Sequence, residues 1–222
     1  MIKAVIYDCD GVMFDSFDAN FSFYERVLNR FGRMLDRSDE ETMRIMHTYS
    51  HRDVLDILFA GDPRREEAIS YAVTIDYREL VPLMRMEDGF RETLDRLRDQ
   101  VRLAVCTNRS TSMDMVLDTF ALTPYFDCVM TAAKVARPKP DPEPLFKVLE
   151  FYRLSPGEVL FVGDSEVDRQ AAAAARVPFI AYKADMPALA RINHHSEIIT
   201  RFFAADVSIP PASYTGPACC SR

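Results

Sequence analysis

Short apolar runs of strand length recur along the chain, and helical patterns separate the later ones. The runs cover residues 2–7, 102–107, 126–131, 159–163 and 177–182. The helical patterns cover residues 89–100, 110–120, 143–152 and 167–175. Strands that alternate with helices are joined by right-handed crossovers and pair in parallel. The sequence therefore predicts an α/β fold in which helices flank a parallel sheet.

The first gap in this alternation is much longer than a crossover needs. About ninety residues separate Gly11 from the second predicted strand, whereas most connections in compact domains are far shorter. Four helical patterns fill the gap, at residues 17–31, 38–47, 52–59 and 64–83. We expect an inserted α-helical cap domain at residues 16–86 and a core made of residues 1–15 and 87–200. The insertion is well placed to act as a lid over the sheet; alternatively, it is a passive helical decoration.

Composition and charge restrict the class of protein. The chain of 222 residues is 48% hydrophobic and carries a formal net charge of −7, which argues against a nucleic-acid surface. No apolar stretch is long enough to span a bilayer, and Asp8 interrupts the N-terminal segment too early for a secretory signal. We expect a cytoplasmic protein that binds neither nucleic acid nor membrane. Residues 201–222 hold several prolines and few apolar anchors, and they are predicted to form an irregular tail.

Two acids and a glycine follow the first predicted strand, at Asp8, Asp10 and Gly11. In an open parallel sheet, ligands bind beyond the carboxyl ends of the strands. Asp8 and Asp10 are therefore expected at the edge where chemistry is done. Two carboxylates this close repel each other unless a metal ion or a proton separates them. The alternative is an ordinary turn, because Asp caps backbone amides and Gly accepts a positive φ.

A second acidic cluster follows the strand predicted at residues 159–163. Asp164 lies at the end of that strand, and Asp168 lies about one helical turn further on. If the two strands are neighbours, these carboxylates join Asp8 and Asp10, and such an oxygen-rich site suits Mg²⁺. The alternative is that Asp164 and the next residue only cap the following helix.

Two further segments carry groups suited to binding phosphate. Thr107 and Asn108 lie at the end of a predicted strand. A hydroxyl and backbone amides in such a place cradle phosphate oxygens. The alternative is that Thr107 is only a helix cap. Lys139 lies between two prolines, which exclude it from a helix and fix where its side chain leaves the chain. An ammonium there offsets carboxylate repulsion and holds a phosphoryl group; the alternative is a lysine of a surface loop.

Four elements of the chain resemble, in order, the motifs of the haloacid dehalogenase superfamily of hydrolases. They are the Asp-x-Asp-Gly-Val segment, the strand-end Thr, the Lys-Pro loop and the Gly-Asp-Ser acids. The resemblance is to the branch that contains phosphoglycolate phosphatase and β-phosphoglucomutase, and it extends from Asp8 to Asp168. It implies a Rossmann-like core with a helical cap inserted just after the first motif, which agrees with the long gap above.

By that resemblance, the protein is a Mg²⁺-dependent phosphatase of a small phosphorylated metabolite. Asp8 is then the nucleophile that forms an aspartyl-phosphate, and Asp10 is the acid and base that moves the proton. The implied metal ligands are Asp8, the Asp10 backbone carbonyl, Asp164 and Asp168, the last directly or through water. The implied phosphate ligands are Thr107, the Asn108 amide and Lys139.

Asp10 also separates the reactions of the superfamily. By the same resemblance, true dehalogenases and phosphonate-cleaving members lack an acid at this position, and the latter use a cap lysine. Residues 17–86 of this chain contain no lysine. The resembled phosphomutase has a cap lysine and a hinge histidine, where this chain has Asn20. We therefore predict hydrolysis; the alternatives are a phosphomutase that acts on a sugar phosphate and a non-catalytic regulatory protein that keeps the fold.

Three other positions remain as candidates. Arg52 lies in a segment that resembles the substrate-selecting loop of this branch, and it is a candidate anion clamp; the alternative is a solvated arginine at a helix start. Arg109 follows the Thr-Asn pair and faces either the cap or the helix surface. His194 and His195 have no acid partner at a metal-binding spacing, and both are predicted to lie at the surface.

Overall fold

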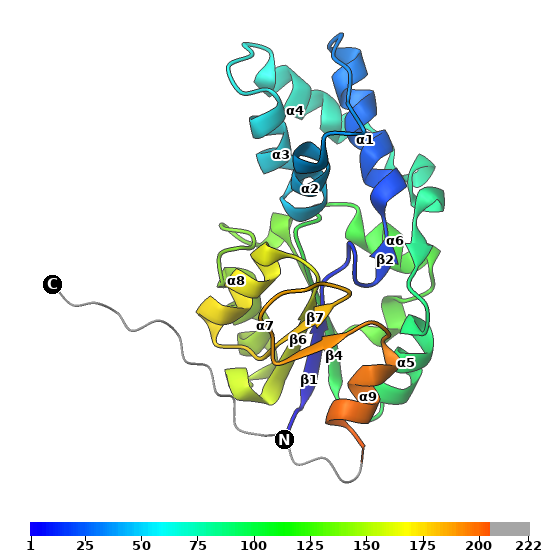
Figure 1. Cartoon of the computed structure of the whole chain (residues 1–222), viewed down its shortest axis with the longest axis vertical. Helices are drawn as coiled ribbons and strands as arrows, with labels where there is room; N and C mark the ends of the chain where they lie inside the picture. Colours follow the sequence, from blue (N-terminus) through cyan, green and yellow to red (C-terminus); the bar gives the residue numbers. More distant parts are fainter. Residues whose placement is uncertain (205–222) are drawn as a thin grey trace, which may run out of the picture.

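A six-stranded parallel sheet forms the centre of the protein, in a computed structural model that describes residues 1–204 (Figure 1). In spatial order the strands are β5 (Cys128–Thr131), β4 (Arg102–Thr107), β1 (Ala4–Tyr7), β6 (Val159–Gly163), β7 (Phe179–Tyr182) and β8 (Ala190–Ile192). Every neighbouring pair is parallel, so the carboxyl ends of the strands meet at one edge. The predicted Rossmann-like α/β core is confirmed. The three-residue strand β8 was not predicted, because it is too short to show a pattern.

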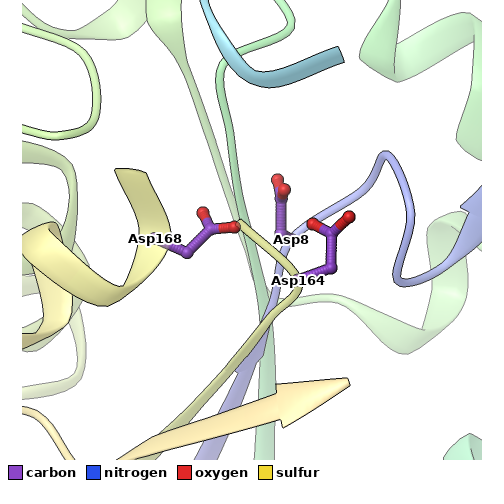
Figure 2. Close-up of side chains that lie close together, drawn as sticks. All are labelled: Asp8, Asp164 and Asp168. Atoms are coloured by element: carbon purple, nitrogen blue, oxygen red, sulfur yellow. The ribbon is translucent and has the colours of Figure 1, made fainter. Parts of the chain in front are cut away.

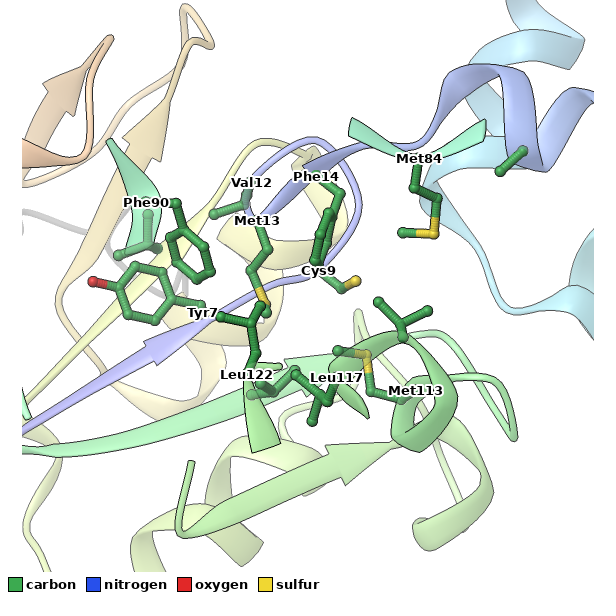
Figure 3. Packing of buried hydrophobic residues seen from close by; sticks show 14 of the residues in the cluster. Tyr7, Cys9, Val12, Met13, Phe14, Met84, Phe90, Met113, Leu117 and Leu122 are labelled. Atoms are coloured by element: carbon green, nitrogen blue, oxygen red, sulfur yellow. The ribbon is translucent and has the colours of Figure 1, made fainter. Parts of the chain in front are cut away.

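Different helices cover the two faces of the sheet. One face is covered by α5 (Phe90–Leu97), α6 (Met113–Thr119) and α9 (Ser196–Phe202), and the other by α7 (Glu143–Tyr152) and α8 (Glu166–Ala175). Successive side chains of a strand point to opposite faces, so Val5 and Tyr7 join the first layer while Ala4 and Ile6 join the second. Figure 3 shows the first layer, where the rings of Tyr7 and Phe90 lie 5.2 Å apart. Burial on both faces explains why the strands read as unbroken apolar runs.

A helical insertion, residues 16–86, extends beyond one end of the sheet (Figure 1). It contains α1 (Phe17–Arg30), α2 (Glu40–Thr48), α3 (His51–Leu58), α4 (Arg65–Thr74) and the 3-10 helices η1 (Tyr77–Glu79) and η2 (Val81–Leu83). Its two connections to the core form an antiparallel ribbon, in which β2 (Phe14–Asp15) pairs with β3 (Arg85–Met86). The insertion is therefore entered and left at adjacent points. That it is a separate cap domain with these bounds stays a prediction.

The last helix of the insertion is shorter than the pattern at residues 64–83 predicts, because α4 ends at Thr74. The chain then turns at Asp76, whose carboxylate accepts a hydrogen bond of 3.0 Å from the backbone N–H of Arg78. An Asp that bonds the backbone in this way favours a cap over a helix interior. Pro82 lacks a backbone donor and also opposes a continuous helix. The two 3-10 helices replace the predicted helical end.

Local sequence sets where other helices begin. Ser165 caps α8 by accepting a hydrogen bond from the backbone N–H of Asp168, and Ala171, Ala172 and Ala175 of that helix pack closely on the sheet. Single 3-10 turns complete the core, at η3 (Thr123–Tyr125), η4 (Ala132–Lys134) and η5 (Pro156–Glu158). No helix within residues 1–204 has both the length and the apolar character to cross a membrane.

The end of the described chain differs from the prediction in two respects. Helix α9 extends past residue 201, where an irregular tail was expected; the rest of that tail, residues 205–222, lies outside the described residues. His194 is exposed as predicted, but His195 is fully buried. Its Nε2–H donates to the Val12 carbonyl over 2.8 Å, and its ring stacks on Tyr182. This burial results from the tertiary packing of α9 on α5, which two adjacent histidines do not indicate.

Candidate active site

The first acid pair follows β1, which lies between β4 and β6 at the centre of the sheet. Asp8 continues the line of the strand, and its backbone N–H donates to the Val162 carbonyl over 2.9 Å. Tyr7 lies level with Val105 on β4 and with Val162 on β6. The segments that leave these three strands therefore meet around Asp8.

Asp8, Asp164 and Asp168 converge at this edge (Figure 2). One carboxylate oxygen from each lies within 4.8 Å of the other two. Burial and the Asp168 carboxylate raise the pKa of Asp8 to about 7, against the opposing charge of Lys139. Burial and the same carboxylate raise the pKa of Asp164 well above its usual range. Acids held this close favour either a proton or a bound cation.

Lys139 supplies positive charge to this acidic group. Its side chain is 1% exposed, and its ammonium lies 2.9 Å from Asp8 Oδ1 and 2.5 Å from Asp168 Oδ1. It also donates to the Cys106 carbonyl over 3.0 Å. Burial alone lowers the pKa of a lysine, but the Asp168 and Asp8 carboxylates outweigh burial and raise the pKa of Lys139 above its usual value. The lysine therefore remains charged inside the protein.

Asp168 has both carboxylate oxygens engaged by the protein. Oδ1 accepts from Lys139, and Oδ2 accepts from the Ser165 backbone N–H over 3.2 Å and from its hydroxyl over 2.5 Å. The side chain is fully buried at the first turn of α8. Ser165 thus caps the helix, as the alternative expects of it, but Asp168 is not solvated: its carboxylate bonds to both Ser165 and Lys139.

Asp10 is held by a different cation. Arg109, which is 3% exposed, donates to Asp10 Oδ2 over 2.8 Å and to Oδ1 over 2.5 Å. The Ser16 hydroxyl also donates to Oδ1. Burial would raise the pKa of Asp10, but the charge and hydrogen bonds of Arg109 and the Ser16 hydroxyl lower it. Asp10 is therefore ionised in this arrangement, and its carboxylate stands apart from the three-acid group.

Two glycines leave the space that the carboxylates occupy. Gly11 has a φ of +73°, and a Cβ at this position would lie 2.0 Å from Asp164 Oδ2. A Cβ on Gly163 would lie 2.6 Å from Asp168 Cβ. Any side chain at either position would displace an acid of the site, and Gly11 also holds a backbone conformation that other residues disfavour.

Thr107 and Asn108 lie where β4 ends, beside the acids. Both are buried, and the Thr107 hydroxyl accepts from the Arg109 backbone N–H over 3.1 Å. The Asn108 side chain donates to the Lys139 carbonyl over 2.9 Å and to the Thr48 carbonyl over 3.1 Å. Asn108 therefore joins the Lys139 loop of the core to the end of α2 in the insertion.

The insertion contributes polar side chains to the same place. The Asn20 amide nitrogen donates to Asp10 Oδ1 over 3.3 Å, and the Tyr77 hydroxyl accepts from Arg109 over 2.5 Å. His47 lines a small pocket together with Asp8, Asp10 and other residues of the sheet edge. The site is thus formed by the core and the insertion together.

Arg52 is not brought to this site. Its side chain is 63% exposed, and its nearest acids are Asp56 at 3.9 Å and Glu66 at 3.7 Å, both in the insertion. It lines a second, larger cleft between the insertion and the core. Its role as an anion clamp stays a prediction.

Sequence reasoning placed the acids, Thr107, Asn108 and Lys139 but not the partners of Asp10. The sequence allows Arg109 to face either the cap or the helix surface. In the structure it contacts Asp10 in the site. Its place directly after the strand-end Asn108 was a usable signal. The contributions of His47 and Tyr77 depend on how the insertion packs on the core, and no local pattern marks them.

Comparison with known proteins agrees with this geometry. Residues 5–182 match the family model described as haloacid dehalogenase-like hydrolase. The match covers most of the chain, and the protein therefore belongs to the haloacid dehalogenase-like hydrolases.

Two relatives of this chain are phosphatases, which indicates the kind of hydrolase. A phosphoglycolate phosphatase of Nitrosospira multiformis is 28% identical over 193 residues, which are 78% of this chain and 80% of the relative. A phosphorylated carbohydrates phosphatase of Thermotoga maritima is 28% identical over 183 residues, 79% of this chain and 82% of the relative. Like them, this protein is a phosphoric monoester hydrolase.

A solved structure is similar as well. The crystal structure of a HAD-superfamily hydrolase, subfamily IA, variant 1, from Geobacter sulfurreducens is 62% identical in sequence. The similarity covers 90% of this chain and 99% of that chain, with a TM-score of 0.81. The predicted family is confirmed by sequence and by structure.

Proposed function

We propose that this protein is a Mg²⁺-dependent phosphatase that hydrolyses a small phosphorylated metabolite through an aspartyl-phosphate on Asp8. The convergence of Asp8 with Asp164, Asp168 and Lys139 at the sheet edge carries this proposal. The names of the two phosphatase relatives refer to phosphoglycolate and to phosphorylated carbohydrates, which supports a small phosphate ester as substrate.

The acidic group fits a hard divalent cation. Its oxygens lie within 4.8 Å of one another, and Asp8 Oδ1 is buried beside the Lys139 ammonium. Mg²⁺ prefers carboxylate and carbonyl oxygens of this kind. Asp8, Asp164 and the Asp10 backbone carbonyl would hold the ion, and Asp168 would act through Lys139 or through water. When bound, the ion would supply positive charge that offsets the charge of the phosphoryl group.

Asp8 is placed to act as the nucleophile. One of its carboxylate oxygens forms a bond to phosphorus, while the bond between phosphorus and the ester oxygen breaks. The ammonium of Lys139, only 2.9 Å away, favours the ionised form of Asp8 that this step requires. Lys139, the Thr107 hydroxyl and the Asn108 amide hold the phosphoryl oxygens, where charge stabilisation and positioning provide most of the catalysis.

Asp10 moves the proton. It has to carry a proton for the leaving oxygen, yet the Arg109 guanidinium holds its pKa low. In this proposal the Asp10 side chain turns away from Arg109, takes up a proton from solvent and then donates it to the leaving ester oxygen. After the leaving group departs, the Asp10 carboxylate takes a proton from the water that attacks the aspartyl-phosphate, and phosphate is released.

In this proposal the helical insertion acts as a cap. Its contacts with Asp10, Asn108 and Arg109 cover the sheet edge, and such a cover excludes water from the reaction. Arg52 would bind an anionic part of the substrate only after α3 moves, because its present ion pairs are with other residues of the insertion.

Phosphate release from p-nitrophenyl phosphate and from a panel of phosphorylated metabolites tests the proposal, with Mg²⁺ and with EDTA. We expect turnover only with Mg²⁺, complete loss in Asp8→Asn, and a loss of about 10²- to 10⁴-fold in Asp10→Asn. The matched control is Asp99→Asn, an exposed acid that precedes the opposite end of β4. Unchanged turnover in Asp8→Asn would sink the proposed chemistry.

The same assay separates the alternatives. A phosphomutase would convert a sugar phosphate into its isomer without releasing phosphate. A non-catalytic protein would release phosphate from no ester, even with Mg²⁺ present.

A further inference from the structure

His47 carries a buried donor that the mechanism above does not use. It lies near the end of α2, and its ring stacks on Phe17 with the centroids 4.8 Å apart and the planes 24° from parallel. Its Nδ1 lies 3.1 Å from the amide nitrogen of Asn20. Its Nε2 is buried and has no hydrogen-bond partner within residues 1–204. A buried polar atom without a partner is costly unless a ligand satisfies it.

The neighbours of Asn20 define the tautomer of His47. The Asn20 carbonyl oxygen accepts from the Tyr77 hydroxyl and from Arg109, each over 3.4 Å. The Asn20 amide nitrogen therefore faces His47 and donates to Nδ1, which carries no proton. The ring proton is on Nε2, and the imidazole is neutral. Burial lowers the pKa of His47, which agrees with the neutral form.

The pocket around His47 is the space next to the reacting groups. It is lined by Asp8, Asp10 and Thr107 of the core and by His47 of the insertion, and its cavity volume of about 10 Å³ holds roughly one water molecule. The phosphoryl group in the proposed mechanism lies against Asp8 and Thr107. When the insertion moves to admit a substrate, the leaving group has to lie on the other side of the phosphoryl group, between Asp10 and His47.

The stacking on Phe17 and the bond from Asn20 fix the direction of the Nε2–H before substrate binds. A donor held in this way favours any substrate that offers an acceptor at the right place, and it penalises a substrate that leaves the donor unpaired. Because the imidazole is neutral, it selects an oxygen acceptor without demanding a negative charge.

We infer that His47 is a specificity-determining residue whose Nε2–H donates a hydrogen bond to an oxygen acceptor on the leaving group, close to the ester oxygen. The substrate class is thus a phosphate monoester whose short leaving group bears a hydroxyl or a carboxylate. This inference rests on the proposed function, because it assigns the leaving group of that reaction.

Three esters with two-carbon leaving groups test the inference: ethyl phosphate, 2-hydroxyethyl phosphate and 2-phosphoglycolate. Ethyl phosphate has no acceptor on the second carbon of its leaving group, and 2-hydroxyethyl phosphate has a hydroxyl there. In 2-phosphoglycolate the second carbon is the carboxylate. We expect the wild-type kcat/KM for at least one of the two acceptor-bearing esters to exceed that for ethyl phosphate. Which of the two is preferred identifies the acceptor.

His47→Phe keeps a ring that stacks on Phe17 but removes the donor, and we expect it to reduce this preference about tenfold. His47→Gln places an amide N–H near the position of Nε2, and it should restore most of the preference. The control His194→Gln, at an exposed histidine outside the site, should leave the preference as in the wild type. An equal loss for all three esters in His47→Phe would overturn the inference, as would an unchanged preference.

A second measurement does not depend on how the variants fold. Nitrogen-15 NMR of the histidine rings in the wild-type protein should show His47 neutral with its proton on Nε2. A proton on Nδ1 would overturn the inference. These outcomes differ from failure of the proposed function, in which the wild type would hydrolyse none of the esters, nor p-nitrophenyl phosphate, in the presence of Mg²⁺.

Discussion

At the scale of single residues, Asp8, the proposed nucleophile, lies in surroundings that disfavour its charge. Its carboxylate is buried beside two other acids, and its pKa is raised from 3.8 to about 7. An acid with a higher pKa in the folded chain than in the unfolded chain binds more protons when folded. In the metal-free protein, the contribution of Asp8 to stability is therefore present at low pH and is lost as the pH rises through about 4 to 7.

Asp8→Asn removes this charge with little change of shape. In EDTA at about pH 8 we expect the variant to unfold at a higher urea concentration than the wild type, because no buried carboxylate remains to be ionised at residue 8. At about pH 5 the difference should shrink, since the wild-type acid is then largely protonated. Urea titrations at the two pH values measure this, and equal midpoints at pH 8 would contradict the raised pKa.

Lys139 gives a second prediction at this scale. Its removal leaves the Asp8 and Asp168 carboxylates buried without their cation. We expect Lys139→Met to destabilise the protein by about 3–5 kcal/mol at neutral pH and to abolish phosphate release. Lys147→Met is the matched control, because its ion pair with Glu143 is 39% exposed on the lysine side and contributes at most about 1 kcal/mol. Similar urea midpoints for the two variants would show that the buried pair is not important.

At the scale of elements, the turn after β1 depends on Gly11. An alanine there would hold an unfavourable positive φ and would press its Cβ against the Asp164 carboxylate at 2.0 Å. We expect Gly11→Ala to lose nearly all activity. Gly61→Ala is the control, since Gly61 has a φ of +76° but, chain neighbours aside, no atom of the described residues within 4 Å of its Cβ position. It should cost about 1–2 kcal/mol of stability and keep its activity, as urea unfolding and phosphate-release assays would show. Comparable activity in the two variants would contradict the steric account.

The elements also explain which features could be predicted from sequence. Asp8 and Asp164 directly follow an apolar strand and Thr107 ends one, and parallel strands bring their carboxyl ends to one edge. Local sequence was therefore enough to place them. His195 and Arg109 are buried by contacts between segments distant in the chain, such as the one that joins Arg109 to Asp10. Their single-sequence context resembles that of a surface residue, so only the packed structure reveals their partners.

At the scale of the whole molecule, metal binding should couple to folding. The three acids lie just after β1, just after β6 and in the first turn of α8, and the unfolded chain does not hold these segments together. A ligand that binds only the folded state at 100 times its Kd stabilises that state by about 2.7 kcal/mol. For a chain of this size we expect Mg²⁺ to raise the Tm by about 5–10 °C.

Thermal unfolding with and without Mg²⁺ measures this coupling. Asp164→Asn should show a much smaller increase, because one ligand of the ion is lost, while Asp99→Asn should behave as the wild type. An equal increase of the Tm in all three proteins would place the binding of Mg²⁺ elsewhere.

The insertion adds a second coupling across the whole molecule. Asn108 contacts Thr48, and Arg109 contacts Tyr77, so the residues at the end of β4 reach both the catalytic acids and the helices that cover them. In the proposed function, closing the cap and completing the site are therefore one structural event. This agrees with a cap that admits substrate when it moves away and excludes water when it returns.

The central claim is that phosphate is carried on Asp8, and borohydride trapping tests it most directly. The protein is mixed with Mg²⁺ and a phosphate ester that it hydrolyses, and the reaction is quenched in acid. Sodium borohydride is then added, which reduces an aspartyl-phosphate to homoserine. We predict homoserine at residue 8 by peptide mass spectrometry, and none when the ester is omitted. Steady turnover with an unmodified Asp8, or with the reduced residue elsewhere in the chain, would contradict the account.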